Sequence, residues 1–254
     1  MDKLINCLYR QPSATTRLIC FPWAGGGSIY YAQWARLFDD SVEVYSLRLP
    51  GRESRSQEPF PQTMDQIVDE ITHLLLPKLC EKSFAFFGHS FGSFASFATA
   101  VRLKEKYNME PLHLFVSGAS APHSRSRSKT LKKSDLTDED LIKWMSTTGG
   151  TPKEILHNMD ALQMVLPPLK ADLNVVENFI YDKPANPPLT CGLTCYDGTE
   201  DSPHDLEAWK DLTSGEFNIH MLPGGHFYLK DPANEKLLVK YTSKYLETAE
   251  ISYL

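Results

Sequence analysis

The sequence predicts an α/β fold, in which helices cover both faces of a mostly parallel central sheet. Two observations support this fold class. Short apolar runs of strand length alternate with runs of helical periodicity over residues 17–117, and the alternation returns after residue 188. One such run, residues 83–87, stops at the turn Gly88-His89-Ser90-Phe91-Gly92, and a helical pattern follows at once. Strands that alternate with helices at this spacing are typical of a parallel sheet.

The elements before residue 120 follow this alternation. Strands are predicted at residues 17–21, 42–47, 83–87 and 112–117, and helices at 29–38, 63–76 and 94–107. The second helix begins with a capping box, Thr63-x-x-Gln66, which satisfies free backbone N–H groups at a helix start. We expect Pro77 to help end the same helix, because proline has no backbone N–H to donate.

The alternation breaks between residues 122 and 188, where three helices and no strand are predicted. Capping signals begin the first two helices near Thr137 and Thr151, and the third follows Pro167-Pro168. Because this segment lies between late strands, we expect it to form a helical cap, or lid, inside a single domain of residues 1–254. Most of its apolar side chains would hold the helices together, and a minority would line a substrate tunnel. The candidates for that lining are Trp144, Met145, Met159, Leu162 and Phe179.

The sheet is predicted to resume at residues 189–196 and to end with a strand at 218–222. A short helix at 204–212 lies between these strands, and a longer helix is predicted at 233–248. The loop after each strand carries polar groups. In an open α/β sheet such loops meet at the carboxyl ends of the strands, which is where ligands bind.

Composition argues against several classes of function. A net charge of −6 is unfavourable for a general nucleic-acid binder, and no apolar stretch has the length of a membrane span. No secretory signal is visible at the N-terminus. Three of the five cysteines fall in apolar, strand-like runs, where a reduced thiol behaves as a small hydrophobic group. We therefore expect a cytoplasmic (cytosolic) protein, and a monomer.

The turn at residues 88–92 fits the pattern Gly-x-Ser-x-Gly, which exposes a serine on a strained turn at the end of a strand. Glycines are required where the backbone packs too closely to admit a β-carbon. Ser90 is therefore the predicted nucleophile, and a purely structural turn is the alternative. The backbone N–H of Phe91 would face the same space as Ser90 and could stabilise an oxyanion.

A second oxyanion donor is expected from the glycine-rich loop after the first strand, Pro22-Trp23-Ala24-Gly25-Gly26-Gly27. Ala24 is the candidate for that N–H. A phosphate-binding loop is the weaker alternative, since no Gly-Lys-Ser/Thr follows the glycines.

Catalysis by a serine also requires a base and an acid that orients the base. Of the eight histidines, His226 alone follows the last strand in a glycine-rich loop, so it is the predicted base. His89 is expected to pack beside the turn. The acid should lie just past the penultimate strand, where Asp197, Glu200 and Asp201 are found. Asp201 is favoured over Asp197 because its position in the loop lets it reach the histidine.

Four motifs resemble those of the stand-alone type II thioesterases, and the resemblance covers essentially the whole chain. They are Cys20-Phe21-Pro22-Trp23-Ala24-Gly25-Gly26-Gly27, Leu49-Pro50-Gly51-Arg52-Glu53, Phe87-Gly88-His89-Ser90-Phe91-Gly92 and Leu222-Pro223-Gly224-Gly225-His226-Phe227. Within that family the chain looks similar to the vertebrate enzymes that act with fatty acid synthase. The family often has methionine after the nucleophile, where this chain has Phe91; only the backbone N–H of that residue is needed.

The resemblance implies an α/β-hydrolase fold with a helical cap, in which Ser90 is the nucleophile, Asp201 the acid and His226 the base. It implies that the substrate is a medium-chain acyl group, held as a thioester on the phosphopantetheine arm of the acyl carrier protein domain of a fatty acid synthase. No metal or other cofactor is implied. The alternatives are a carboxylesterase or lipase acting on oxygen esters, an editing thioesterase of a polyketide or peptide synthetase, and a catalytically silent binding module.

A basic segment at residues 122–133 has two interpretations. Its charges are Arg125, Arg127, Lys129, Lys132 and Lys133. A solvated loop is favoured, and a dock for the acidic acyl carrier protein is the more specific hypothesis. Arg48 and Arg52 have the same two interpretations, with a role in the structure of the turn favoured.

Overall fold

The computed structural model describes residues 3–127 and 132–253. Its described strands form one sheet of seven strands in the order β1-β3-β2-β4-β5-β6-β7. The strands are β1 (Ile5–Asn6), β2 (Thr16–Phe21), β3 (Val42–Leu47), β4 (Ser83–His89), β5 (His113–Ser117), β6 (Gly192–Gly198) and β7 (Phe217–Leu222). Neighbouring strands pair in parallel, except that β1 pairs antiparallel with β3.

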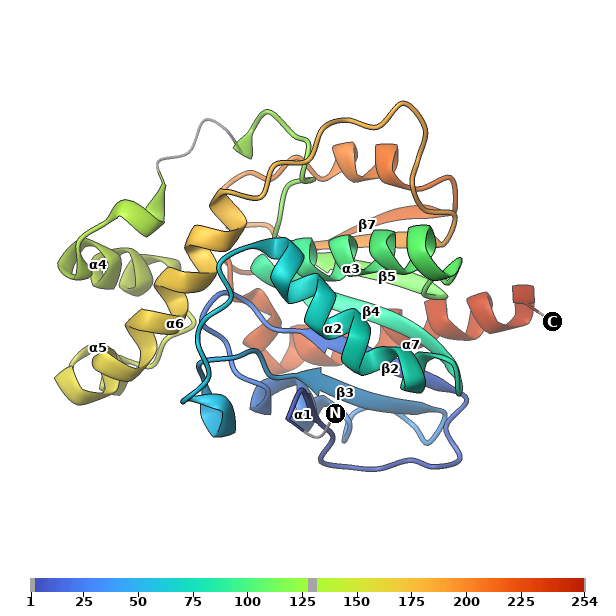
Figure 1. Cartoon of the computed structure of the whole chain (residues 1–254), viewed down its shortest axis with the longest axis horizontal. Coiled ribbons are helices and arrows are strands. Elements are labelled where there is room, and N and C mark those ends of the chain that lie inside the picture. The colour runs from blue at the N-terminus through green and yellow to red at the C-terminus, as the bar shows by residue number, and fades with distance from the viewer. Residues whose placement is uncertain (1–2, 128–131, 254) are drawn as a thin grey trace.

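Helices lie on both faces of this sheet (Figure 1). One face is covered by α2 (Met64–Leu79) and α3 (Phe91–Tyr107), and the other by α1 (Ile29–Trp34) and α7 (Pro232–Tyr253). Successive strand residues point to opposite faces. Accordingly, Phe86 belongs to the apolar core that includes residues of α2 and α3, whereas Phe87 belongs to the core that includes residues of α1 and α7. The predicted α/β fold, with a mostly parallel sheet between two layers of helices, is confirmed.

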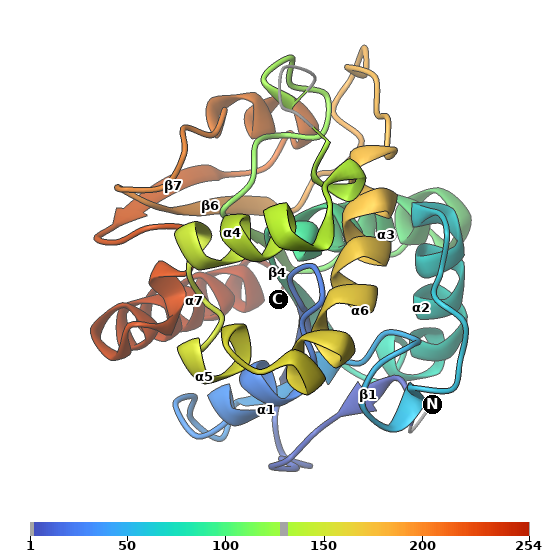
Figure 2. The same ribbon diagram turned by 90° about the vertical axis from the view of Figure 1, so that its left-hand side faces the viewer.

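The described residues between β5 and β6 form helices and no strand. The helices are α4 (Asp138–Thr148), α5 (Lys153–Leu156) and α6 (Met159–Glu177). They lie to one side of the sheet in Figure 1, and in Figure 2 they stand in front of it. Leu141, Met145 and Leu162 are among the residues of a separate apolar core within these helices. Ala24, from the loop after β2, packs against this core, so the helices cover that loop.

Three prolines do not end or begin helices as predicted. Pro167-Pro168 lies inside α6, which is one continuous helix, and Pro77 lies inside α2. An interior proline costs a helix about 3 kcal/mol, because it removes a hydrogen bond and clashes with the preceding turn. Residues on both sides of the double proline, Leu166 and Leu169, are buried in the same core. Packing of that face outweighs the local preference of the prolines.

Other differences lie at the ends of elements. The strand predicted at 189–196 is displaced to Gly192–Gly198, and α1 ends at Trp34. The helix predicted at 204–212 is a 3₁₀ turn, η4 (Glu207–Leu212). The short strand β1 was not predicted, because two residues carry no periodic pattern. Such boundaries depend on tertiary contacts more than on local sequence.

All five cysteines are free, and Cys20, Cys191 and Cys195 are buried, as expected of thiols in apolar strand-like segments. None of the described helices combines the length and the apolar character that crossing a membrane requires.

Candidate active site

Ser90 occupies a strained turn between β4 and α3. Its backbone dihedrals are φ +54° and ψ −117°, outside the regions that non-glycine residues ordinarily adopt, and α3 begins at the next residue. The turn is compact because a β-carbon on Gly88 would lie 2.1 Å from the carbonyl oxygen of Gly92. One on Gly92 would lie 2.2 Å from the carbonyl oxygen of Phe21. Backbone strain of this kind costs about 1–3 kcal/mol and gathers at functional sites.

Hydrogen bonds to the neighbouring strand hold this turn in place. The Ser90 N–H donates to the carbonyl of Ser117 at the end of β5, at 2.7 Å. The hydroxyl of Ser93 lies 2.8 Å from the Gly88 carbonyl oxygen and 3.0 Å from that of Ser117. The serine is therefore presented from a rigid support, and its side chain is only partly buried.

His226 and Asp201 are brought together from the loops after β7 and β6. Nδ1 of His226 lies 2.7 Å from Oδ2 of Asp201, and the two side chains are 15% and 7% exposed. With the Nδ1 proton donated to Asp201, Nε2 is the imidazole nitrogen that can accept a proton. Burial by itself raises the pKa of the Asp201 carboxyl group, but the hydrogen bond and charge of His226, with the charge of His204, hold that pKa below its ordinary value. The carboxylate is therefore ionised at neutral pH.

The ring of His226 lies beside the serine turn. Its centroid is 4.9 Å from that of His89, the residue that precedes Ser90. A β-carbon on Gly118, which follows β5 with φ +62°, would lie 3.4 Å from Cε1 of His226. His89 packs beside the turn as expected: its ring is buried, and Nδ1 lies 2.8 Å from the Ser117 hydroxyl. Burial and the charges of nearby cations lower the pKa of His89 well below its ordinary value, so this ring is neutral.

Asp197, the penultimate residue of β6, and Asp201, in the loop that follows, have different partners. Oδ2 of Asp197 lies 2.8 Å from Nδ1 of His204, and Oδ1 accepts from the Gly198 N–H. The structure thus brings Asp201, and not Asp197, to His226. His204 was not singled out from the sequence, although it lies 3.7 Å from Asp201 as well. Burial lowers the pKa of His204, but the hydrogen bond to Asp197 and the charges of both aspartates raise it above its ordinary value.

The glycine-rich loop after β2 makes a tight turn next to α6. The Gly26 N–H donates to the Trp23 carbonyl at 2.8 Å, and Gly25 has φ +70°. Among residues 3–127 and 132–253, no group accepts a hydrogen bond from the N–H of Ala24. Phe91 is the first residue of α3, where a backbone N–H has no partner within the helix and the helix dipole favours negative charge. Both candidate donors are thus suited to an anion.

Comparisons with known proteins identify the family of the chain. Residues 16–245 match the family model described as the thioesterase domain. The chain belongs to the thioesterase family. It is 52% identical over 251 residues to the rat protein named S-acyl fatty acid synthase thioesterase, medium chain, covering 99% of this chain and 95% of the rat protein. Its identity to the human protein of the same name is 48%, with the same coverage.

Solved structures support the fold of this thioesterase. The type II thioesterase BorB from the borrelidin biosynthetic cluster superposes with a TM-score of 0.84 and 28% identity, covering 96% of this chain and 98% of BorB. Human thioesterase 2 is 42% identical, with a TM-score of 0.71 and coverage of 93% and 98%. The α/β-hydrolase type of fold expected from the sequence is therefore shown.

The predicted tunnel residues of the thioesterase lie in different surroundings. Met145 and Leu162 are buried in the apolar core formed by α4–α6, and Trp144 packs at its edge. Met159 is 70% exposed at the start of α6. Phe179 lies past the end of α6 and packs against the main core. The five residues thus stay candidates for the lining of an acyl tunnel, and they do not share one packing environment.

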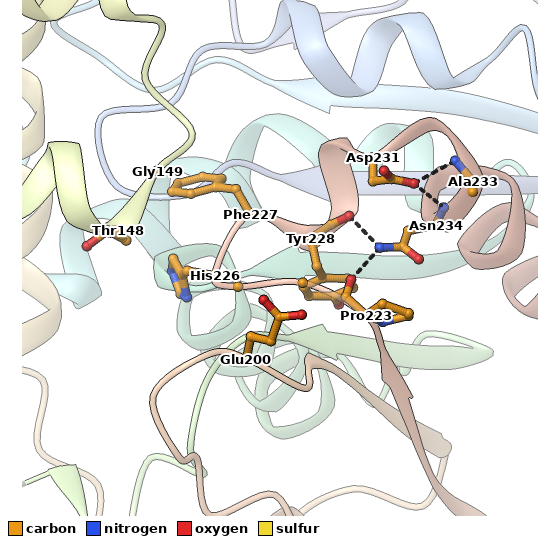
Figure 3. A pocket seen from close by; sticks show the side chains of 12 residues that line it. Thr148, Gly149, Glu200, Pro223, His226, Phe227, Tyr228, Asp231, Ala233 and Asn234 are labelled. Atoms are coloured by element: carbon orange, nitrogen blue, oxygen red, sulfur yellow. Dashed lines mark hydrogen bonds between the residues drawn. The ribbon is translucent and has the colours of Figure 1, made fainter.

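A pocket of about 560 Å³ lies beside the loop after β7 that carries His226, called the histidine loop below (Figure 3). Its walls combine Thr148 and Gly149, at the end of α4, with His226 and Phe227 of the histidine loop. Ser90 is not among the residues that line it. The pocket thus lies between the end of α4 and the histidine loop.

Asp201, His204 and His226 each place one possible metal-binding atom within 4.8 Å of the others. These atoms are already engaged: the Asp201 carboxylate faces His226, and His204 faces Asp197. Hydrolysis by a serine requires no metal at this position.

Most of the described basic residues between 122 and 133 make contacts within the protein. Arg127 donates to the carbonyls of Pro122, Val176 and Phe179, and its guanidinium carbon lies 4.4 Å from the centre of the Phe94 ring. Lys132 donates to Asn178, and Nζ of Lys133 lies 5.5 Å from the centre of the Trp144 ring. Arg125 is exposed, and Lys129 lies outside the described residues.

The turn residues Arg52 and Glu53 hold the glycine-rich loop. Arg52 is buried and pairs with Asp172 of α6, with Nη1 2.7 Å from Oδ2. Glu53 accepts hydrogen bonds from the N–H and hydroxyl of Ser28 and from Arg48. Arg48 and Arg52 thus both have the structural role that the sequence favoured. Asp172 was not singled out from the sequence, although an acidic residue beside Leu173 on an apolar helix face was a usable signal.

Proposed function

We propose that this thioesterase hydrolyses medium-chain acyl thioesters on the acyl carrier protein domain of a fatty acid synthase and releases the free fatty acid. The observation that supports the chemistry best is the 2.7 Å hydrogen bond between His226 and Asp201, beside the strained turn of Ser90. The substrate is suggested by the names of the rat and human relatives. We expect the protein to act in the cytosol, as a monomer and without a cofactor.

In the proposed mechanism, Oγ of Ser90 attacks the thioester carbonyl while Nε2 of His226 takes its proton. The tetrahedral intermediate collapses, the C–S bond breaks, and His226 returns the proton to the leaving pantetheine sulfur. Water then attacks the acyl-serine ester with His226 again as the base, which releases the acid and restores Ser90. Asp201 keeps the proton on Nδ1 and stabilises the imidazolium formed in each half-reaction.

The N–H groups of Phe91 and Ala24 would hold the oxyanion in both steps. Loss of one such donor typically costs about 3–4 kcal/mol of transition-state stabilisation. The two donors come from the loops after neighbouring strands, since β2 pairs directly with β4. Both are backbone groups, so they are set by the fold and not by side-chain rotamers.

We propose that residues 122–188 act as the cap and that the acyl chain enters between the cap and the strand ends. Each buried methylene contributes about 0.8 kcal/mol, so chain length is selected where the apolar space ends. For this role the cap core near Met145 and Leu162 would have to open, because both side chains are buried against their neighbours.

A second candidate is an editing role on a peptide or polyketide synthetase. It is suggested by a relative named gramicidin S biosynthesis protein GrsT, which is 36% identical over 89% of this chain. The identity is lower than that to the rat protein. In both roles the scissile bond is a carrier-bound thioester.

One experiment separates these functions. Hydrolysis should be measured for saturated acyl chains of increasing length on acyl carrier protein, on coenzyme A and as p-nitrophenyl esters, with Ser90→Ala as the matched inactive variant. The proposal predicts a kcat/KM maximum at medium chain length, higher on the carrier protein than on coenzyme A. Preference for oxygen esters would make the protein an esterase, and preference for short acyl groups would favour editing. Near-normal turnover by Ser90→Ala would refute the serine mechanism.

A further inference from the structure

A buried ion pair joins the cap to the loop that carries Ala24. Asp172 on α6 and Arg52 in the turn after β3 have side chains that are only 2% and 5% exposed. Nη1 and Nη2 of Arg52 lie 2.7 and 2.9 Å from the two carboxylate oxygens. A two-point pair of this kind fixes orientation as well as distance.

The same side chains hold the backbone of the glycine-rich loop. The Gly25 N–H donates to Oδ2 of Asp172 at 2.7 Å, and Nη1 of Arg52 donates to the Gly26 carbonyl at 3.1 Å. A β-carbon on Gly25 would lie 3.0 Å from the β-carbon of Leu169, so α6 packs directly over this peptide. The loop is therefore clamped between the cap helix and the arginine.

This clamp determines where the N–H of Ala24 points. Peptide groups are planar, so the N–H of Ala24 points opposite to the carbonyl of Trp23. That carbonyl accepts a hydrogen bond from the Gly26 N–H, and Arg52 holds the same residue through the Gly26 carbonyl, which belongs to the next peptide. On the other side of Ala24, Asp172 fixes the next peptide through Gly25. Both peptide planes that flank Ala24 are thereby fixed.

The charge of Asp172 explains why the loop is held by an ion pair and not by a carboxylate alone. A lone carboxylate buried close to the loop would repel a negative charge that develops at the Ala24 N–H. Arg52 neutralises Asp172 and leaves the backbone hydrogen bond in place. The pair thus holds the loop without opposing the oxyanion.

We propose that Arg52 and Asp172 are positioning residues for the oxyanion donor Ala24, so that the seating of α6 on the sheet domain controls the rate of acyl transfer. This inference rests on the proposed function. Neither side chain is required to touch the substrate. Their loss should reduce kcat and leave KM nearly unchanged, because the interaction they support forms in the transition state.

The test is the double variant Arg52→Met with Asp172→Leu, which removes both charges, keeps apolar volume and leaves the Gly25 N–H without its acceptor. Activity is expressed per active site, counted by labelling Ser90 to completion with a fluorophosphonate. We expect kcat to fall roughly 10- to 100-fold, as is typical when a catalytic group is displaced by about 1 Å, with KM within about twofold of wild type. Arg52→Met alone should lose more kcat, because the carboxylate then remains unneutralised.

A matched control is available in the buried pair Arg17–Glu43, whose side chains are 6% and 7% exposed. It joins β2 and β3 near their first residues, whereas the Ala24 loop follows the last residue of β2. The double variant Arg17→Met with Glu43→Leu should keep wild-type kcat per labelled site. Equal losses in the two double variants would overturn the proposal, as would an effect of Arg52 and Asp172 on KM alone.

If the double variant does not fold, kcat is measured for Arg52→Lys. Lysine keeps the positive charge but cannot contact both carboxylate oxygens of Asp172 at once. A several-fold lower kcat is expected, and wild-type kcat would overturn the proposal. Failure of the proposed function would look different: the wild-type protein itself would not hydrolyse thioesters, or Ser90→Ala would remain active.

Discussion

Lys230 donates a hydrogen bond to the carbonyl of Gly150 at 2.6 Å and thereby joins the histidine loop to the segment between α4 and α5. The same ammonium lies 4.7 Å from the centre of the Trp23 ring and 5.0 Å from that of Phe227. Gly150 has φ +82°, and a β-carbon there would lie 2.3 Å from the Phe227 ring. The loop between α4 and α5 is thus in direct contact with the residue that follows His226 (Figure 3).

Replacing Lys230 by methionine should loosen this contact. The apolar stem can still cover Trp23, but the hydrogen bond to Gly150 is lost, and a single exposed hydrogen bond contributes about 1 kcal/mol. We expect faster amide hydrogen exchange in residues 148–151, with little change in global stability. The exposed Lys236 on α7, changed to methionine, is the matched control. Unchanged exchange in the Lys230 variant would contradict this role.

Asp201→Asn and Asp197→Asn should have very different effects on turnover. Asparagine in place of the acid would leave His226 in the wrong tautomer, which in serine hydrolases lowers kcat by roughly 10⁴-fold. Asp197 faces His204, so its replacement should reduce kcat much less. Steady-state kinetics on one acyl thioester, with circular dichroism to confirm folding, gives the comparison. A larger loss from Asp197→Asn would move the acid to that residue.

Gly92→Ala should destabilise the fold as well as the site. The added methyl group would meet the Phe21 carbonyl at 2.2 Å, and overpacking of this severity costs about 3 kcal/mol. Gly225→Ala is the comparison, because a β-carbon at Gly225 has no neighbour within 4 Å. Thermal unfolding should show a markedly lower Tm for Gly92→Ala alone. Equal Tm values would show that the turn can relax around a side chain.

His113 should make the fold sensitive to acid. Burial lowers the pKa of this histidine from 6.5 to about 3, and its Nε2 lies 2.8 Å from the Thr194 hydroxyl. Between these values the unfolded chain binds a proton that the folded chain excludes. His113 therefore leaves the free energy of unfolding unaffected above pH 6.5. Below that pH it lowers this free energy by about 1.4 kcal/mol per pH unit, down to about pH 3.

The measurement is the free energy of unfolding by urea at several pH values, for wild type and His113→Gln. Glutamine does not titrate, so the variant should lose stability less steeply below pH 6.5. The exposed His73 on α2, changed to glutamine, serves as a surface control. Parallel pH profiles for wild type and His113→Gln would show that His113 takes up its proton without unfolding.

The sequence predicted those features that local patterns encode. The serine turn could be recognised because Gly88 and Gly92 are required within a few residues of Ser90, and a strand and helix flank them. His226 could be proposed because its loop follows the last strand. A parallel sheet brings such loops to one edge, whatever the helices between them do.

Tertiary structure decided what depends on contacts between distant segments. Asp197, at the end of β6, and Asp201, in the loop that follows, are four residues apart, and only the path of the chain after β6 and β7 shows which of them meets His226. Pro167-Pro168 predicted a break between two helices, but α6 is continuous because Leu166 and Leu169, on either side of the prolines, are buried in the same core. Asp172 stands out locally as an acidic residue in an apolar helix, but its partner Arg52 lies 120 residues earlier in the chain and cannot be inferred from local sequence. Such pairs form because a buried charge must find a partner wherever the fold brings one near.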